Sequence, residues 1–398
     1  MIPVAKAIKI IEREITPLRS ERIAIADASG RVLAEDIIAD SDLPPFHRSQ
    51  MDGYAVKAVD TEAAPVTLTI VGEAAAGRGW PGTLKKGEAV RIMTGAPLPK
   101  GADAVQKIEL AREENGEVTF HEPTAKGRYI VRRGSEAKKG DVMMRAGQAL
   151  TPNSIAVPAA FGYAPLKVAK RPRVAVLSTG SEIVDIASKP KPDQIRNSNS
   201  IMLAEMCRTA GAVVEILPTA GDDLATLKAR ISEASRDSDM LITTGGVSVG
   251  KYDLTKAALS ELGAQIFFER IRIKPGKPTV FARLKKTTFF GLPGNPVSAA
   301  ATFYLFVRKA LLLMQDAAET DLPSGFAVLE SDIKGTKERE SFLPARLATD
   351  SRGRLIALPI KWHGSSDLVG FAGADALVRI PAGSNFKAGD SAPILFLP

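Results

Sequence analysis

The sequence predicts a multi-domain protein in which a central open α/β sheet domain is accompanied by two smaller β domains and a connector. Its 398 residues are enough for about two to four domains. Strand-like and helix-like segments alternate between residues 171 and 318, and short β-rich runs punctuated by glycine occur before and after them. Such alternation is typical of an open, mostly parallel sheet. We expect a helix and connector (1–43 and 141–170), a β domain (44–140), the α/β domain (171–318) and a C-terminal β-barrel domain (319–398).

The first elements follow from the spacing of apolar residues. Apolar side chains recur at helical intervals from Val4 to Ile15, which predicts an amphipathic helix that Pro17 ends. In the first β domain, Asn115-Gly116 separates two strand-like runs and predicts a hairpin. The connector contains one short expected helix, within 151–162.

The α/β domain begins with a buried strand at Arg173. Helices are expected over 197–211, 223–234 and 253–263 and after Pro296, and strands over 212–218, 239–244, 265–273, 278–284 and 287–292. Strands return after Leu322, over 326–331, 342–360 with a turn at 350–353, 376–382 and 392–398. In an open α/β sheet, ligands bind beyond the carboxyl ends of the strands. The loops to inspect are therefore 178–183, 220–223, 244–253 and 291–296.

Composition excludes several classes of protein. A single cysteine, Cys207, excludes an internal disulfide framework, and three scattered histidines do not predict a nitrogen- or sulfur-ligated metal. No uninterrupted apolar stretch reaches membrane-spanning length, and the N-terminus lacks signal-peptide features. We expect a soluble cytoplasmic protein. The net charge of +8 favours anionic partners. Aromatic residues at stacking spacing are scarce, so a small oxyanion or phosphate is favoured over nucleic acid. Most single Lys and Arg residues are also compatible with an ordinary solvated surface.

The segment TTGGVSVGKYD (243–253) is the most informative loop. Gly245 and Gly246 follow a strand and allow backbone N–H groups to approach an anion, while Ser248 adds a hydroxyl before the next helix. This pattern indicates a phosphate site, although it lacks the spacing of a P-loop or a dinucleotide fold. Asp253 has an alternative interpretation as the N-cap of the following helix.

Three carboxylates are expected at the same edge of the sheet. Glu182, Asp222 and Asp253 each follow a strand, and together they are candidate ligands of Mg²⁺, which prefers oxygen donors. A magnesium ion there would stabilise charge in phosphoryl chemistry. The alternatives are an ordinary exposed glutamate at Glu182 and a helix cap at Asp222 or Asp223.

Two further loops favour anion binding. Lys274 and Lys277 flank a Pro-Gly turn, and GLPGNP (291–296) combines a rigid turn with a helix N-terminus. A plain strand-to-helix turn is the alternative for the second loop. Residues Asp52 and Thr94 of the first β domain have turns as their default interpretation, with a hairpin turn at Asp52-Gly53.

Taken together, these segments resemble one family. The matching stretches, in order, are PPFHRSQMDGYAV, GEAVRIMTGAPLPKGADAV, KRPRVAVLSTGSEIV, QIRNSNS, TTGGVSVGKYD, IKPGKP and FGLPGNPVSA. The chain is similar to the molybdopterin molybdenumtransferases (the MoeA and gephyrin E-domain family of molybdenum insertases) over nearly its whole length. Each motif alone is weak, whereas seven in family order are specific.

The resemblance implies a homodimer that takes adenylylated molybdopterin and molybdate as substrates. Such an enzyme inserts molybdenum with release of AMP in a Mg²⁺-dependent step, between an upstream molybdopterin adenylyltransferase and downstream molybdoenzymes. The expected catalytic residues are Asp52, Thr94, Glu182, Asp222 and Asp253, of which the last three are metal ligands. The expected binding residues are Gly245, Gly246, Ser248, Lys274, Lys277, Pro293, Pro296, Arg346 and Ser365.

The chain departs from the family pattern at two places. His47 to Gln50 replaces the usual residues before MDGYA, and Ser181 replaces an acid in STGSE. Two other functions stay open at this point: the adenylyltransferase step itself, whose enzyme resembles the α/β domain, and a non-enzymatic scaffold similar to gephyrin. The two flanking β domains argue against a lone adenylyltransferase.

Overall fold

The protein, described here by a computed structural model, forms two compact units. The structure describes residues 1–246, 254–361 and 363–398. The first unit comprises Met1–Glu35, Ala146–Thr151 and Pro165–Pro398, and the second comprises Asp36–Arg145 and Pro152–Ala164. Each unit has hydrophobic clusters of its own.

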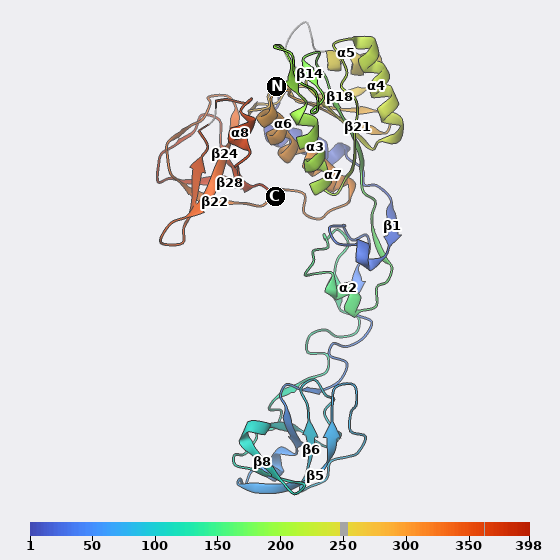
Figure 1. The fold of residues 1–398 in the computed structure, drawn as a ribbon, viewed down its shortest axis with the longest axis vertical. Helices are drawn as coiled ribbons and strands as arrows, with labels where there is room; N and C mark the ends of the chain where they lie inside the picture. The colour runs from blue at the N-terminus through green and yellow to red at the C-terminus, as the bar shows by residue number, and fades with distance from the viewer. Residues whose placement is uncertain (247–253, 362) are drawn as a thin grey trace. The chain divides into compact units, whose positions relative to one another are not determined.

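The centre of the first unit is a six-stranded sheet (Figure 1). In spatial order its strands are β16 (Val213–Ile216), β13 (Arg173–Ser178), β17 (Met240–Thr244), β21 (Thr287–Leu292), β20 (Val280–Leu284) and β18 (Gln265–Phe268). The first four strands are mutually parallel, and β20 and β18 add antiparallel pairs. The predicted open, mostly parallel sheet is therefore confirmed.

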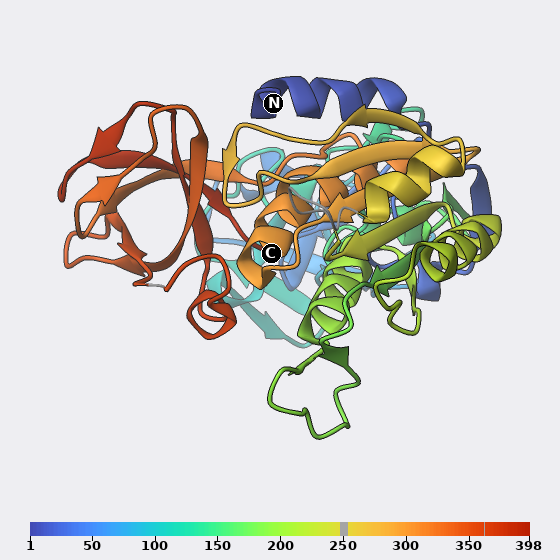
Figure 2. The ribbon, with the colours of Figure 1, turned by 90° about the horizontal axis from the view of Figure 1, so that it is seen from above.

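Helices cover both faces of this sheet because its buried strands are apolar on both sides. Along β13, Val174 and Val176 pack with one hydrophobic cluster, whereas Ala175 and Leu177 pack with another. The first cluster includes α1 (Val4–Glu14), α3 (Ser198–Thr209), α6 (Pro296–Thr302) and α7 (Arg308–Met314), and the second includes α4 (Leu224–Asp237) and α5 (Leu254–Glu261). Figures 1 and 2 show α4 and α5 across the sheet from α3, α6 and α7.

The helical run Pro296–Met314 forms part of the core. A π-helical turn, Phe303–Val307, joins α6 to α7. Among the described residues this run alone is long and apolar enough to cross a membrane, and 78% of its apolar window is buried inside the protein. Its burial accounts for its apolar character, since it packs against the sheet rather than facing solvent.

The C-terminal residues form a closed five-stranded barrel. Its strands are β22 (Ser324–Leu329), β24 (Glu340–Thr349), β25 (Leu355–Pro359), β26 (Ala376–Ile380) and β28 (Ser391–Phe396). Closure is achieved because β24 pairs with both β25 and β26, so that the strands surround a shared apolar core (Figure 2). A short helix, α8 (Leu368–Phe371), precedes β26.

The prediction of one strand in the α/β domain is wrong. The sequence predicts a single strand over 265–273, but the structure has β18 and then a separate β19 (Ile273–Lys274). β19 pairs in parallel with β24 of the barrel, with Lys274 opposite Ser341. The chain therefore leaves the α/β sheet after Phe268. Smaller pairs complete the unit: β1 (Ser20–Ile23) with β12 (Leu166–Ala169), β14 (Ile183–Val184) with β15 (Ile195–Arg196), and β23 (Ile333–Lys334) with β27 (Asn385–Phe386).

The second unit contains another six-stranded sheet. Its order is β7 (Ala104–Lys107), β4 (Gly53–Val56), β6 (Glu88–Ile92), β5 (Val66–Ala74), β9 (Glu117–Phe120) and β8 (Ala111–Glu114). The predicted hairpin at Asn115-Gly116 is confirmed: both residues have positive φ, as the turn between β8 and β9 requires. Small elements complete the unit: β2 (Ile37–Ile38) with β11 (Val142–Met144), β3 (Arg48–Ser49) with β10 (Ile130–Val131), and α2 (Ala156–Ala160).

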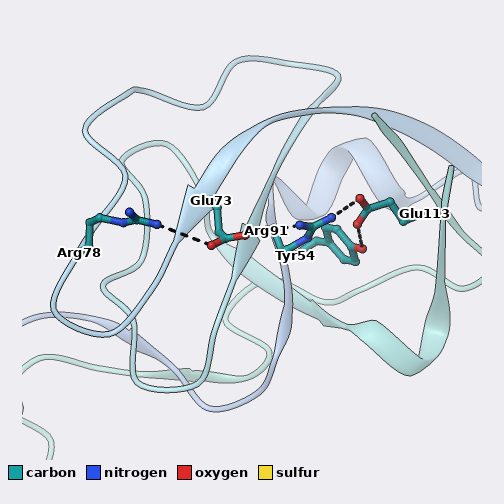
Figure 3. Close-up of polar contacts among 5 residues, drawn as sticks. All are labelled: Tyr54, Glu73, Arg78, Arg91 and Glu113. Atoms are coloured by element: carbon teal, nitrogen blue, oxygen red, sulfur yellow. Dashed lines mark hydrogen bonds and ion pairs between the residues drawn. The ribbon is translucent and has the colours of Figure 1, made fainter. Parts of the chain in front are cut away.

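A chain of polar contacts links strands of this second sheet (Figure 3). The Tyr54 hydroxyl donates to Glu113 over 2.5 Å, and the Arg91 guanidinium bonds both Glu113 and Glu73. Arg78 lies 3.8 Å from the other oxygen of Glu73. The bonds from Arg91 and Tyr54 lower the pKa of Glu113 below its usual value. Since Glu113 lies on β8 and its partners on β4 and β6, the network ties the sheet edge to central strands.

This lowered pKa predicts a pH-dependent contribution to stability. A carboxyl group with a lower pKa in the folded state stabilises fully above its unfolded pKa of about 4.3, and loses that effect as the pH falls through the folded value. Glu113→Gln is therefore expected to lower the denaturation midpoint of the full chain at pH 7, with the difference from the wild type shrinking below about pH 4. The control is Glu114→Gln, whose exposed carboxylate pairs only with Arg112 among the described ion pairs. Equal effects of the two substitutions at pH 7 would contradict this role.

Candidate functional site

The loops at the carboxyl edge of the parallel strands enclose a cavity of about 410 Å³. Its walls come from the ends of β13 and β17, from residues 195–199, which lead from β15 into α3, and from residues 294–296, which lead into α6. Ser366 and Leu368 of the C-terminal part also line it. Three of the four loops that strand order predicts as the ligand site contribute residues to the cavity, whereas loop 220–223 does not line it. The C-terminal domain adds a wall that strand order did not predict.

Asparagine and hydroxyl side chains hold these loops in register. Asn199 donates to Thr244 Oγ1 over 3.0 Å and to the Gly294 carbonyl over 2.7 Å. Asn197 caps α3 by accepting from Ser200 N, and it also donates to Ser178 Oγ over 2.8 Å. The ends of β13, β17 and β21 are therefore fixed to one another through α3.

Two polar atoms of the cavity wall are buried without a partner among the described residues, Thr179 Oγ1 and Asn199 Oδ1. Thr179 also explains the first of the glycines that follow β17. A Cβ on Gly245 would lie 2.6 Å from the Thr179 carbonyl oxygen, and Gly245 has φ +92°. Only glycine fits there.

The structure separates the roles of the neighbouring residues Asp222 and Asp223. Asp223 caps α4, accepting from Thr226 N over 2.7 Å, and its hydrogen bonds to Thr226 lower its pKa. Asp222 instead accepts from Ser181 N over 3.1 Å, in the loop that follows β13. The alternative of a helix cap is therefore confirmed for Asp223 and wrong for Asp222.

Glu182 and Asp222 approach the same loop. A Cβ built on Gly180 would lie 2.4 Å from Glu182 Oε2, and the backbone N–H of the next residue, Ser181, donates to Asp222 Oδ2. Both residues are exposed. Ser248 and Asp253, which the sequence also predicts for this site, lie outside the described residues. Within the described part of the chain no group of three or more metal-binding side chains occurs. The two carboxylates are nonetheless hard oxygen donors beside one loop, which fits Mg²⁺ rather than a softer metal.

Lys274 and Lys277 flank a tightly packed turn. Ile271 N and Thr279 N both bond the Lys277 carbonyl, and Gly276 packs so closely on Thr302 that no side chain would fit. Neither lysine forms an ion pair among the residues that the structure describes, and neither lines the cavity. They remain candidates for an anion that also contacts this turn.

Of the other predicted binding residues, Pro293, Pro296 and Ser365 lie around the start of α6. The Pro293 carbonyl accepts from Thr244 Oγ1, and Pro296 begins the helix. Ser365 accepts from Asn295 Nδ2 over 2.7 Å, and its carbonyl accepts from Val297 N. Arg346 lies elsewhere on the barrel, on β24, where its guanidinium packs against Gly373. The loop 291–296 therefore joins the α/β domain to the barrel and is more than a plain turn.

In the second unit, the predicted residues Asp52 and Thr94 bind each other. Asp52 Oδ1 accepts from Thr94 N over 2.6 Å and from Thr94 Oγ1 over 2.8 Å. These bonds lower the pKa of Asp52, so the carboxylate stays ionised. The alternative of a hairpin turn at Asp52-Gly53 is wrong, because Gly53 begins β4 and a Cβ there would lie 1.9 Å from the Gln106 carbonyl oxygen. The turn predicted at Thr94 is confirmed by the bond from Ala96 N to Met93 O.

Sequence reasoning missed several residues of the cavity. Asn197, Asn199 and Thr179 were not selected, although QIRNSNS and STGSE are among the matching motifs. A signal was present: two asparagines alternate with serines where a strand gives way to a helix. Ser366 and Leu368 gave no such signal, because they lie in the C-terminal part of the chain, far in sequence from the other cavity residues.

The fold and the site define an α/β protein of the molybdopterin-binding type with added β domains, as comparison with known families shows. Residues 2–162 match the MoeA N-terminal region (domain I and II), residues 175–312 the probable molybdopterin binding domain, and residues 327–397 the MoeA C-terminal region (domain IV). The crystal structure of the molybdopterin biosynthesis moeA protein from Pyrococcus horikoshii OT3 is 31% identical, with a TM-score of 0.87 and complete coverage of both chains.

Two bacterial relatives match over nearly the whole chain. The molybdopterin molybdenumtransferase of Staphylococcus aureus (strain COL) is 35% identical over 399 residues, covering 99% of this chain and 95% of the relative. That of Bacillus subtilis (strain 168) is 35% identical over 408 residues, covering 100% and 94%. The chain therefore belongs to the molybdopterin molybdenumtransferase family, a family of transferases.

Proposed function

We propose that this protein inserts molybdenum from molybdate into adenylylated molybdopterin, with release of AMP. The observation that carries the proposal is the cavity at the carboxyl edge of the α/β sheet, within a chain that belongs to this family. The start of α3 lines the cavity and presents the positive end of the helix to a phosphate, whereas the Gly245 N–H already donates to the Leu292 carbonyl. Thr179 and Asn199 add polar side chains to the cavity wall.

The proposal includes Mg²⁺ held by Glu182, Asp222 and Asp253. When bound, the ion supplies positive charge to the phosphoanhydride oxygens. The chain's own residues position one of the carboxylates that would hold the ion. Ser181 N donates to the Asp222 carboxylate, and the adjacent Asp223 caps the beginning of α4. Molybdate is assigned to Lys274 and Lys277, with Arg346 and Ser365 as further candidates.

The protein is proposed to act as a homodimer in the cytoplasm. Asp52 and Thr94 belong to the second unit, whereas the cavity belongs to the first, and the family resemblance implies that the two sets meet across subunits. In the cytoplasm, an upstream adenylyltransferase would supply the substrate and molybdoenzymes would receive the product.

The decisive experiment is a measurement of AMP release by the purified protein. AMP should appear only when adenylylated molybdopterin, molybdate and Mg²⁺ are all present, and molybdenum should be recovered on the dithiolene. Formation of adenylylated molybdopterin from ATP, without molybdate dependence, would instead support the adenylyltransferase alternative. Absence of both reactions would contradict an enzymatic function in this step.

Lys277→Ala is expected to raise the apparent KM for molybdate by about 10- to 150-fold, the usual effect of losing one charge-assisted contact. Turnover at saturating molybdate should stay close to the wild-type value, because the contact holds a substrate that excess concentration can restore. Lys286→Ala is the control, since this exposed lysine lies in the turn between β20 and β21. AMP release measured against molybdate concentration distinguishes the two variants. An unchanged KM for Lys277→Ala would contradict the assignment of molybdate to this lysine.

A further inference from the structure

A cationic and aromatic cluster lies beside Asp52 in the second unit. The Lys107 ammonium lies 4.8 Å from the centre of the Tyr129 ring, and the Arg128 guanidinium carbon lies 5.0 Å from it. Arg128 also donates to the Tyr129 hydroxyl over 3.2 Å. All three side chains are half-buried. Their mutual packing gives two like charges a common aromatic neighbour, which attracts cations through the negative face of its ring.

The backbone holds this cluster against the Asp52 segment. Gln50 N donates to the Tyr129 carbonyl over 2.9 Å, and Ile108 N, next to Lys107, donates to the Asp52 carbonyl over 3.1 Å. Lys107 is also the register partner of Gly53 across β4 and β7. The cluster and the Asp52–Thr94 pair therefore belong to one corner of the unit.

Tyr129 has a backbone conformation that non-glycine residues rarely adopt. Its φ is +54°, in the left-handed region, directly before β10. Strained backbone of this kind is concentrated at functional sites, where surrounding contacts enforce it. Here the bond from Gln50 N on one side and the bond from Val105 N to the Arg128 carbonyl on the other enforce it. In this conformation the Tyr129 ring lies within about 5 Å of both cations.

Lys107 and Arg128 carry more hydrogen-bond donors than the Tyr129 hydroxyl can satisfy. Within the described residues neither Lys107 nor Arg128 forms an ion pair, and the nearby carboxylate Asp103 lies 4.0 Å from Lys126 instead. A guanidinium carries five N–H donors and an ammonium three, while the Tyr129 hydroxyl accepts one bond from Arg128. Half-buried cations without a carboxylate partner are suited to receive an anion, because the anion restores the hydrogen bonds that burial removes.

We propose that Lys107, Arg128 and Tyr129 form a binding site for a tetrahedral oxyanion in the second unit. The inference rests on the proposed function for the identity of that oxyanion, which is either molybdate or the phosphate of the adenylylated substrate. Arg128 contacts the anion, Lys107 adds charge, and Tyr129 positions both cations. None of these three residues is among the site residues predicted from the sequence.

The test is calorimetric titration of the full chain with two probes, molybdate and AMP, in separate arms. Arg128→Gln should lower the affinity for one of the two probes by about 10- to 100-fold, and the probe that is affected identifies the source of the oxyanion. Arg128→Lys should retain part of the affinity, and Tyr129→Phe should show a smaller loss because Arg128 keeps its charge. Arg112→Gln, an exposed arginine of the same unit that pairs with Glu114, should leave both affinities unchanged.

Two outcomes would overturn the site: wild-type protein that binds neither probe, or Arg128→Gln protein that binds both as tightly as the wild type. Melting temperatures of the variants exclude unfolding as the cause of a loss. This binding test does not depend on the proposed function, which is tested separately by AMP release. A chain that binds a probe through Arg128 but releases no AMP would contradict only that function.

Discussion

Asp222→Ala is expected to reduce turnover by at least about 100-fold while leaving the protein folded. Asp222 does not cap a helix; its carboxylate is held by Ser181 N beside the loop that also carries Glu182. Under the proposed function it acts on charge that develops in the transition state, and losing one such interaction costs roughly 10²- to 10³-fold in rate. Excess molybdate should not restore the activity, because the loss is in turnover rather than in molybdate binding.

The adjacent Asp223 provides the matched control. Asp223→Ala removes the cap of α4, so it should lower the melting temperature by a few degrees and leave turnover near the wild-type value. AMP release and melting temperature, measured on both variants, separate the two roles. If Asp223→Ala lost as much turnover as Asp222→Ala, loop order in general and not the Asp222 carboxylate would be responsible.

Mixing two inactive variants should restore activity if each site combines residues of two subunits. Asp52→Ala removes the partner of Thr94 in the second unit, and Asp222→Ala changes the loops of the first unit. In a randomly mixed population half of the dimers contain one chain of each kind, and one of their two sites carries neither substitution. Activity should therefore recover to about a quarter of the wild-type value per chain.

The measurement needs unfolding and refolding of the variants together, with separately refolded samples as the control. Light scattering on the same samples reports the mass of the particle. A monomer with full wild-type activity would contradict the dimeric site, and so would a dimer in which the mixed variants remain inactive.

Much of the architecture could be predicted because its signals are local. The alternation of strands and helices predicts the α/β sheet, and the order of its parallel strands predicts which loops meet, since the carboxyl ends of parallel strands share an edge. Asn115-Gly116 predicts the hairpin through φ angles that these two residues tolerate. Gly245 likewise meets a local demand, a positive φ close to the Thr179 carbonyl.

The choice between Asp222 and Asp223 shows where local reasoning ends. Both residues precede the same helix, and either has a side chain able to cap it. Only the path of the loop after β13, 41 residues earlier in the chain, brings Ser181 N to Asp222 and leaves the cap to Asp223. The same holds for β19, which follows β18 in sequence but pairs with β24 of the barrel.

The sequence by itself determined the element types, the edge of the sheet that carries the site, and the family. The tertiary structure decided which side chains meet: Asn199 with Gly294, 95 residues apart, Asp52 with Thr94, 42 residues apart, and Tyr129 with Lys107. The physical reason is that periodicity, capping and turn preferences act within a few residues. A hydrogen bond across a cavity, by contrast, depends on the path of every segment between its partners.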